Sequence, residues 1–252
     1  MQFEYTISFN VRSYEVDQNG RATMPSVCNY FQEAAGVHAN HLQFDIEQLR
    51  ENGLTWVLYK MEVHVDRYPE RWEEITVKTR PSAGDGLRAL RDYELLDKEG
   101  NRIAAAVSQW MVLNLKTRRP VRVPKEILNL GLKEPTHVIK PDKKPIKQVE
   151  NHSEQNMAPV TRVGLHHLDM NGHANNVTYI SWFTGHVPES IVASKQCRRF
   201  EIQYISECNA GDDITIAREM IDQDEGVALR QTLYKSDEDQ FIPISAAVSH
   251  WI

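Results

Sequence analysis

Apolar and polar residues alternate through the first stretch of the chain, and helical spacing replaces this alternation soon afterwards. Between Phe3 and Val16 about every second residue is apolar, which is typical of a strand with one buried face. Thr23 and Pro25 then supply a helix cap and a proline suited to a first helical turn. The pattern therefore predicts a strand at residues 3–16 and a helix that continues through Val37.

A second, shorter helix is predicted next, followed by four strands. Asp45 and Gln48 have the spacing of a capping box, and Gly53 is suited to end that helix. After it the first half predicts only strands, separated by turn sequences, at residues 56–65, 72–80, 87–96 and 103–115. Short connections favour antiparallel neighbours, so we expect the long helix to lie against one face of a curved sheet.

The second half repeats this order. The aspartate, asparagine and glycine at positions 17, 19 and 20 recur at 169, 171 and 172, and residues 105–110 (AAVSQW) recur as residues 246–251 (AAVSHW). The matching elements are a strand at 160–168, a helix at 176–184 and strands at 200–206, 213–219, 227–235 and 241–251. The predicted fold class is therefore α+β, with two tandem domains, each a curved antiparallel sheet wrapped around a long central helix.

The duplication predicts the domain limits. We expect an N-terminal domain at residues 1–127, a linker rich in Pro, Lys and Glu at 128–157, and a C-terminal domain at 158–252. The first half has extra residues after its long helix, which we assign to the helix at 45–53. Such an insertion is suited to shape a ligand tunnel.

The composition narrows the class of protein. The chain has 252 residues, of which 41% are hydrophobic and 25% charged, and no run approaches the roughly 20 apolar residues of a membrane helix. The net charge of -6 argues against nucleic acid as a partner. The start of the chain lacks the pattern of a signal peptide, so a cytoplasmic location is expected. Cys28, Cys197 and Cys208 show no CxxC spacing, so free thiols are expected.

Candidate chemistry gathers where a strand of the second half turns into its helix. Asp169, Asn171 and His173 bring a carboxylate, an amide and an imidazole into one short turn, as an acyl-transfer site requires. The helix that follows offers backbone N–H groups and a partial positive charge to an oxygen that becomes negative. Glu207 follows a different strand and could act as a base for water or orient His173. Arginine occupies the matching position 21 of the first half, so one active site per chain is expected.

Simpler interpretations of these residues stay open. Asp-x-Asn-Gly is also a good turn sequence, and a single histidine after a strand is more often structural. Cys208 could be a nucleophile that His173 activates, but a thiol beside a strand end is more often packing. His166 and His167 with His173 could suggest a metal, yet neighbouring strand residues face opposite sides and no further ligand completes a set. No metal site is therefore predicted.

These motifs resemble the acyl-acyl carrier protein thioesterases, a family with two hot-dog folds in one chain. The resemblance covers nearly the whole chain. It rests on residues 12–16 (RSYEV), 32–34 (QEA), 68–72 (YPERW), 91–93 (RDY), 117–120 (TRRP), 168–182 (LDMNGHANNVTYISW) and 204–208 (YISEC). The sequence departs from the family in having alanine at 174, where valine is common, and in lacking the transit peptide or hydrophobic N-terminal segment of plant members. The second departure suggests a bacterial-type enzyme.

The resemblance implies an activity and a set of residues. It implies hydrolysis of the thioester between a fatty acyl chain and acyl carrier protein, which releases free fatty acid, ends fatty acid synthesis and needs no cofactor. The family's catalytic residues fall on Asp169, Asn171, His173 and Glu207, with its neighbouring cysteine on Cys208. As a hypothesis, the helix end holds the thioester oxygen, Asn171 and His173 position carbonyl and water, Glu207 removes a proton from the water, and Asp169 orients its neighbours. A covalent route through Glu207 stays open.

The resemblance also implies that the first half holds the acyl chain. Met24, Phe31 and Met61 are candidate tunnel walls, although core packing would explain them equally well. Arg118, Arg119 and Arg122 lie in a basic run, and a second basic run extends from Lys140 to Lys147. Either run could attract the acidic carrier protein. The alternative is that these charges only solvate a strand end and the linker.

Other functions stay open beside this one. They are a hot-dog acyl-CoA thioesterase, a hot-dog dehydratase or hydratase, and a non-catalytic acyl-binding module. The sequence fixes neither the preferred chain length nor the oligomeric state; a homodimer is one possibility because paired hot dogs often pair again.

Overall fold

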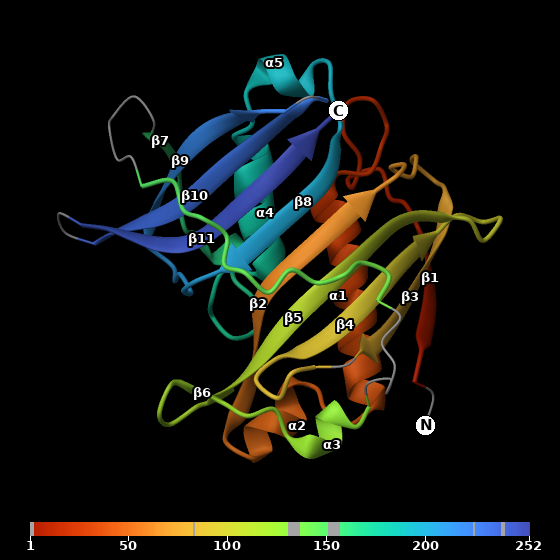
Figure 1. The fold of residues 1–252 in the computed structure, drawn as a ribbon, viewed down its shortest axis with the longest axis vertical. Coiled ribbons are helices and arrows are strands. Elements are labelled where there is room, and N and C mark those ends of the chain that lie inside the picture. Colours follow the sequence, from red (N-terminus) through yellow and green to blue (C-terminus); the bar gives the residue numbers. More distant parts are fainter. Residues whose placement is uncertain (1–2, 83, 131–136, 151–156, 224, 238–239) are drawn as a thin grey trace. The chain divides into compact units, whose positions relative to one another are not determined.

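The computed structural model describes residues 3–82, 84–130, 137–150, 157–223, 225–237 and 240–252. The chain forms two compact units, Met1–Asp142 and Lys143–Ile252. Each unit has a sheet with one principal helix (Figure 1). The linker expected at 128–157 is shared between the units, since 137–142 belongs to the first and 143–150 to the second, while 131–136 and 151–156 lie outside the described residues.

The helices of the first unit begin where the sequence predicts. Thr23 caps α1 (Met24–His41) by accepting the N–H of Ser26 at 3.3 Å, and a proline lies in the first turn. Asp45 and Gln48 form the predicted capping box of α2 (Ile46–Glu51). The structure also contains α3 (Lys125–Leu128). This single turn follows the last long strand, so the prediction that only strands come after the second helix is wrong.

The sheet of the first unit is antiparallel, in the order β1-β3-β4-β5-β2, with β6 paired to β5. The four predicted strands are confirmed with small shifts at their ends. The predicted N-terminal strand ends early, because residues 12–15 form a turn closed by the N–H of Glu15 on the carbonyl of Arg12. The strands are β1 (Tyr5–Asn10), β2 (Leu54–Val65), β3 (Glu74–Ser82), β4 (Ala89–Leu96), β5 (Arg102–Asn114) and β6 (Arg119–Val121).

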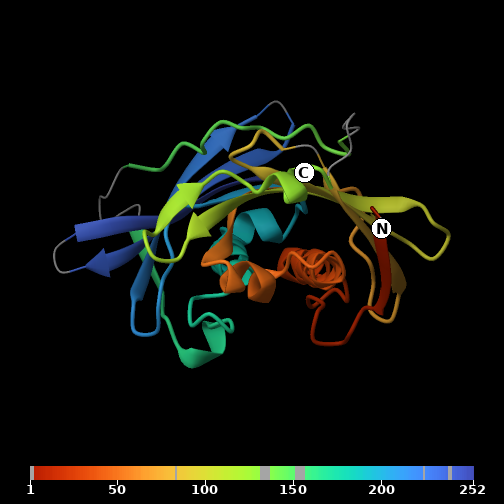
Figure 2. The ribbon, with the colours of Figure 1, turned by 90° about the horizontal axis from the view of Figure 1, so that it is seen from below.

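Helix α1 lies along the concave face of the first unit's sheet (Figure 2). Phe31 of α1 is fully buried and meets Tyr93 of β4 with ring centroids 5.1 Å apart. At 18 residues α1 is longer than the 10-residue principal helix of the second unit. The extra length of the first half is therefore largely in this central helix, not chiefly in the short helix at 45–53 as the sequence suggested.

The second unit repeats the arrangement with the strand order β8-β11-β10-β9-β7. Its first predicted strand, residues 160–168, is wrong in its second part, because β7 ends at Arg162 and a 3-10 turn follows. The short helix α5 was not predicted. The elements are β7 (Met157–Arg162), η1 (Leu165–His167), α4 (Asn176–Gly185), α5 (Glu189–Val192), β8 (Cys197–Tyr204), β9 (Asp213–Asp222), β10 (Val227–Asp237) and β11 (Gln240–Trp251).

Matching bonds in the two units confirm the duplication. The indole N–H of Trp110 donates to Ser108 Oγ at 2.7 Å, and that of Trp251 donates to Ser249 Oγ at 2.8 Å. Trp251 is buried, whereas Trp110 is only half-buried. The recurring sequence at the two strand ends therefore encodes the same local structure.

Candidate active site

A tight turn before α4 carries three of the candidate residues. The backbone N–H of Asp169 donates to the carbonyl of His173 at 2.8 Å, and the N–H of Gly172 donates to the carbonyl of Asp169 at 3.0 Å. Gly172 has φ 79°, a left-handed conformation that glycine adopts without steric cost. The turn therefore places Asp169, Asn171 and His173 just before the N-terminus of α4.

The Asp169 carboxylate holds this turn together. Its Oδ1 accepts the backbone N–H of Asn171 at 2.7 Å and that of His173 at 3.4 Å. Its Oδ2 accepts the side-chain amide of Asn171 at 3.1 Å. Each contact fixes a neighbour, so the geometry supports the orienting role given to Asp169.

Several backbone groups at the start of α4 form hydrogen bonds within the chain. Asn175 Oδ1 accepts the N–H of Val177 at 2.9 Å, and the carbonyl of Asn175 accepts the N–H of Thr178. The carbonyl of His167 accepts the N–H of Asn175 at 2.9 Å and the hydroxyl of Thr178 at 3.3 Å. These contacts hold the start of α4 against the segment that precedes the turn.

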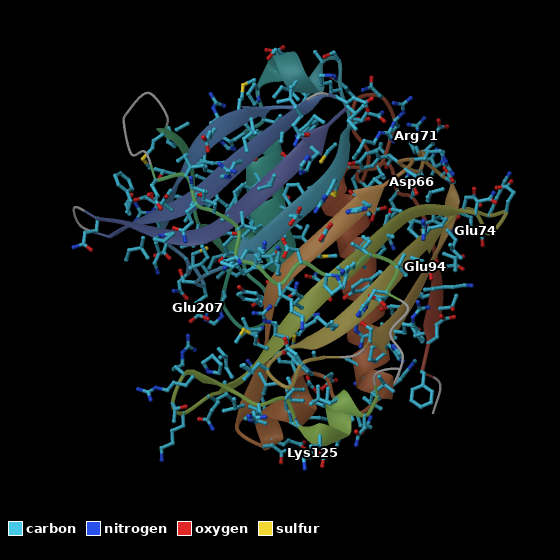
Figure 3. All side chains as sticks on the ribbon, in the orientation of Figure 1. Asp66, Arg71, Glu74, Glu94, Lys125 and Glu207 are labelled. Atoms are coloured by element: carbon cyan, nitrogen blue, oxygen red, sulfur yellow. The ribbon has the colours of Figure 1, made fainter. Side chains whose placement is uncertain are left out.

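Glu207 reaches the turn from the segment that follows β8 (Figure 3). The N–H of Ala174 donates to the carbonyl of Cys208 at 3.0 Å, and His173 pairs with Asn209 in an antiparallel bridge. These ties bring Glu207 Oε2 to 3.3 Å from His173 Nδ1. The two side chains retain 40% and 32% of their exposure, so water can reach both.

Cys208 is enclosed beside this pair. It has no exposed surface, and its Sγ lies 3.2 Å from the hydroxyl of Tyr179. Burial is the largest cause of a raised pKa for the Cys208 thiol. A buried, protonated thiol is a poor nucleophile, so the structure favours packing over nucleophilic catalysis for this residue.

The neighbouring histidines have local partners. Rings 166 and 167 lie 3.9 Å apart between centroids, and His167 Nδ1 accepts the N–H of Gly164 at 3.0 Å. Burial first, and then His166, lowers the pKa of His167. Among the described residues, no group of three or more His, Cys, Asp or Glu side chains is arranged to hold a metal ion.

The remaining candidates are divided between core and surface. Met24, Phe31 and Met61 are buried in the first unit. Arg118, Arg119 and Arg122 are exposed around β6. The hydroxyl of Tyr179, which contacts Cys208, was not recognised from the sequence, because a tyrosine in an apolar helix is usually explained by packing alone.

The fold and the turn together define the class of protein. Each unit is an antiparallel sheet curved around one helix, and the second unit adds a turn with aspartate, asparagine and histidine beside a glutamate. This is a tandem hot-dog protein. Residues 2–130 match the family model of the acyl-ACP thioesterase N-terminal domain, and residues 148–251 match that of the C-terminal domain. The chain belongs to the acyl-ACP thioesterase family.

Individual relatives agree with this assignment. The chain is 30% identical over 228 residues to oleoyl-acyl carrier protein thioesterase 2, chloroplastic, of Arabidopsis thaliana, a match that covers 83% of this chain and 61% of the relative. It therefore spans about three fifths of that protein's length. A solved acyl-ACP thioesterase from Bacteroides thetaiotaomicron superposes with a TM-score of 0.86 at 27% identity over 99% of this chain and 98% of that one.

A further solved structure supports the fold alone. The 12:0-ACP thioesterase from Umbellularia californica superposes with a TM-score of 0.87 at 23% identity, covering 100% of this chain and 98% of that one.

Within the residues that the structure describes, no helix has both the length and the apolar character to cross a membrane.

Proposed function

We propose that this chain hydrolyses the thioester that joins a fatty acyl chain to acyl carrier protein, releasing free fatty acid and ending fatty acid synthesis. The observation that carries the proposal is the turn before α4, where Asp169 holds Asn171 and Glu207 lies 3.3 Å from His173. The names of the relatives supply the substrate class. A cytoplasmic location is part of the same proposal.

The turn suggests a sequence of events for hydrolysis. A water held near His173 and Glu207 attacks the carbonyl carbon, and Glu207 takes its proton. An amide nitrogen carries two hydrogens, so Asn171 can serve both Asp169 and the carbonyl oxygen as that oxygen becomes negative. The carbonyl then re-forms as the C–S bond breaks, and the leaving sulfur takes the proton back from Glu207, so that a free thiol and the fatty acid are released. Hydrolysis of this kind requires no cofactor.

The decisive experiment measures thiol release from a long-chain acyl-acyl carrier protein and from the matching acyl-CoA. We expect rapid release that strongly prefers the carrier-protein ester and that falls about 1,000-fold in Asp169→Ala. Preference for acyl-CoA would instead identify an acyl-CoA thioesterase. Tight acyl binding without release from either ester would identify a binding module, and an unsaturated product with the thioester intact would identify a dehydratase.

The role of Glu207 needs a separate pair of variants. Its contact with His173 Nδ1 is also the geometry of a carboxylate that orients an imidazole. Glu207→Gln keeps a hydrogen-bond acceptor but cannot take a proton, whereas Glu207→Ala has neither property. For a general base, we expect both variants to lose about 100-fold or more in kcat with the fold intact. If Glu207→Gln retained most of the activity, orientation of His173 would be its main role.

The same proposal assigns the acyl chain to the first unit and the carrier protein to its basic surface. Met24, Phe31 and Met61 are the proposed walls of the acyl site. For docking we propose Arg118, Arg119 and Arg122, which are exposed and positively charged. We expect Arg118→Glu with Arg119→Glu to raise KM for the carrier-protein ester, to leave the acyl-CoA reaction unchanged, and to reduce the salt dependence of the carrier reaction. An unchanged KM would remove this surface from the proposal.

A further inference from the structure

The hydroxyl of Tyr179 contacts the backbone on both sides of Glu207. It donates to the carbonyl of Ser206 at 3.4 Å and accepts the N–H of Cys208 at 3.1 Å. Tyr179 lies in the first turns of α4 and is only 2% exposed. One buried hydroxyl on the helix therefore binds the residues immediately before and after the glutamate.

This arrangement is absent from the matching position of the first unit. The carbonyl of Pro69 accepts the N–H of Ala22 just as that of Cys208 accepts the N–H of Ala174, so Pro69 matches Cys208. Proline has no N–H to donate. Val27, which follows its helix cap by the same number of residues as Tyr179, has no hydroxyl. In the first unit, Tyr68 occupies the position of Glu207, and both the backbone N–H after it and the helix hydroxyl that would accept that N–H are missing.

We propose that Tyr179 is a positioning residue that sets the distance between Glu207 and His173; this inference rests on the proposed function. Glu207 is partly exposed and lies outside β8. Its neighbours are tied to the sheet and to the turn, because the carbonyl of Ile244 in β11 accepts the N–H of Ser206 at 3.1 Å and the carbonyl of Cys208 accepts the N–H of Ala174 at 3.0 Å. The tyrosine hydroxyl adds a bond on each side of Glu207 to the helix whose N-terminal turn carries His173. A misplacement of about 1 Å at a reacting group can cost about 100-fold in rate, which makes such a restraint valuable.

The ring of Tyr179 has a separate packing role, which the test must leave intact. Its centroid lies 5.3 Å from Trp182 and 5.5 Å from Tyr204. Tyr179→Phe keeps these ring contacts and removes only the hydroxyl. Tyr234→Phe is the matched control, because the Tyr234 hydroxyl is also buried and donates to a backbone carbonyl, that of Val149, at 2.6 Å.

The experiment measures kcat and KM for acyl-acyl carrier protein in both variants, alone and combined with Glu207→Gln. We expect Tyr179→Phe to lower kcat about 10-fold with little change in KM, and Tyr234→Phe to leave both unchanged. In the Glu207→Gln background, Tyr179→Phe should cost less than about twofold more, since it acts through Glu207. Full activity in Tyr179→Phe, or losses that multiply in the double variant, would overturn the proposal.

A second readout keeps this inference separate from the proposed function. NMR spectra of protein with labelled histidine report the His173 ring, assigned by its loss in His173→Gln. We expect the His173 signals to move in Tyr179→Phe in the same direction as in Glu207→Gln, and to stay in place in Tyr234→Phe. Unmoved signals would reject the positioning role even if the wild-type protein released no thiol, and shifted signals would uphold it in that case.

Discussion

The turns at Asp17 and Asp169 share their backbone hydrogen bonds but differ in what their side chains can do. In both, the aspartate N–H donates at 2.8 Å to the carbonyl four residues later, and the aspartate carboxylate accepts backbone N–H groups of the turn. Asp17, Asn19 and Arg21 are exposed, whereas their counterparts in the second unit are half-buried. The backbone of the turn therefore belongs to the fold, and the chemistry depends on the side chains added to it.

The segments that pair with these two turns also share their backbone arrangement and differ in their side chains. Glu70 pairs with Arg21 as Asn209 pairs with His173, so the two segments approach their turns in the same register. What changes is that Tyr68 and Pro69 replace Glu207 and Cys208, which removes a carboxylate and a backbone donor. The two units therefore share this backbone arrangement, whereas the matching positions of the first unit lack the pair formed by His173 and Glu207.

The largest expected effect comes from removing one turn carboxylate and not the other. Asp169→Ala leaves the Asn171 amide and two backbone N–H groups without their acceptor, so we expect kcat to fall about 1,000-fold. Asp17→Ala removes equivalent backbone bonds from an exposed turn and should cost about 1 kcal/mol of stability with activity unchanged. Thiol-release kinetics and thermal unfolding check both. Equal activity losses in the two variants would mean that the turns do not differ in function.

The second-largest loss of activity is expected when His173 is replaced by arginine, the residue at the matching position 21. Arg21 shows that this backbone accepts arginine, so His173→Arg should fold. We expect it to lose about 100-fold or more in kcat, because a guanidinium pairs with Glu207 permanently and cannot exchange a proton at neutral pH. The reciprocal Arg21→His should gain nothing, since Tyr68 supplies no carboxylate there. Circular dichroism verifies folding before kinetics, and residual activity near wild type in His173→Arg would remove His173 from the site.

The sequence predicted these turns because their determinants are local. Aspartate and glycine at fixed spacing specify the turn, and Thr23, Asn175 and Asp45 specify helix starts through bonds to residues two or three positions away. The strand alternation was equally readable. Each of these features depends on neighbours in the chain.

Other features depend on distant segments or on very short elements. The predicted strand extended to Leu168, but the carbonyl of Gly164 accepts the N–H of His167 and forms a 3-10 turn. The role of Tyr179 requires contact with a backbone 29 positions away, which no local pattern encodes. Single turns such as α3 and α5 are too short for a periodic signal.

A smaller effect, on the preferred acyl chain length, should distinguish helix α1 from helix α4. Phe31 of α1 and Phe183 of α4 follow their turns at the same distance, and both are fully buried. Phe31→Leu and Phe183→Leu should each cost about 1 kcal/mol of stability. We expect only Phe31→Leu to shift activity several-fold toward longer acyl chains, because the first unit is the proposed acyl site. Initial rates over carrier-protein esters of increasing chain length check this, and identical profiles for the two variants would argue against that assignment.

The smallest effect is expected at Cys208. Because burial raises the pKa of its thiol, the protonated form dominates at neutral pH, and alkylation of the folded protein should be slow at this position. Cys208→Ala keeps the backbone N–H that binds Tyr179, so we expect kcat to fall less than about threefold. Cys28→Ala, which removes an equally buried thiol from α1, is the control for packing. A loss as large as that of His173→Arg, with Cys28→Ala fully active, would restore a chemical role for the thiol. Retained activity would place the difference between the two turns in His173 and Glu207, with the thiol serving only to fill the space beside the tyrosine hydroxyl.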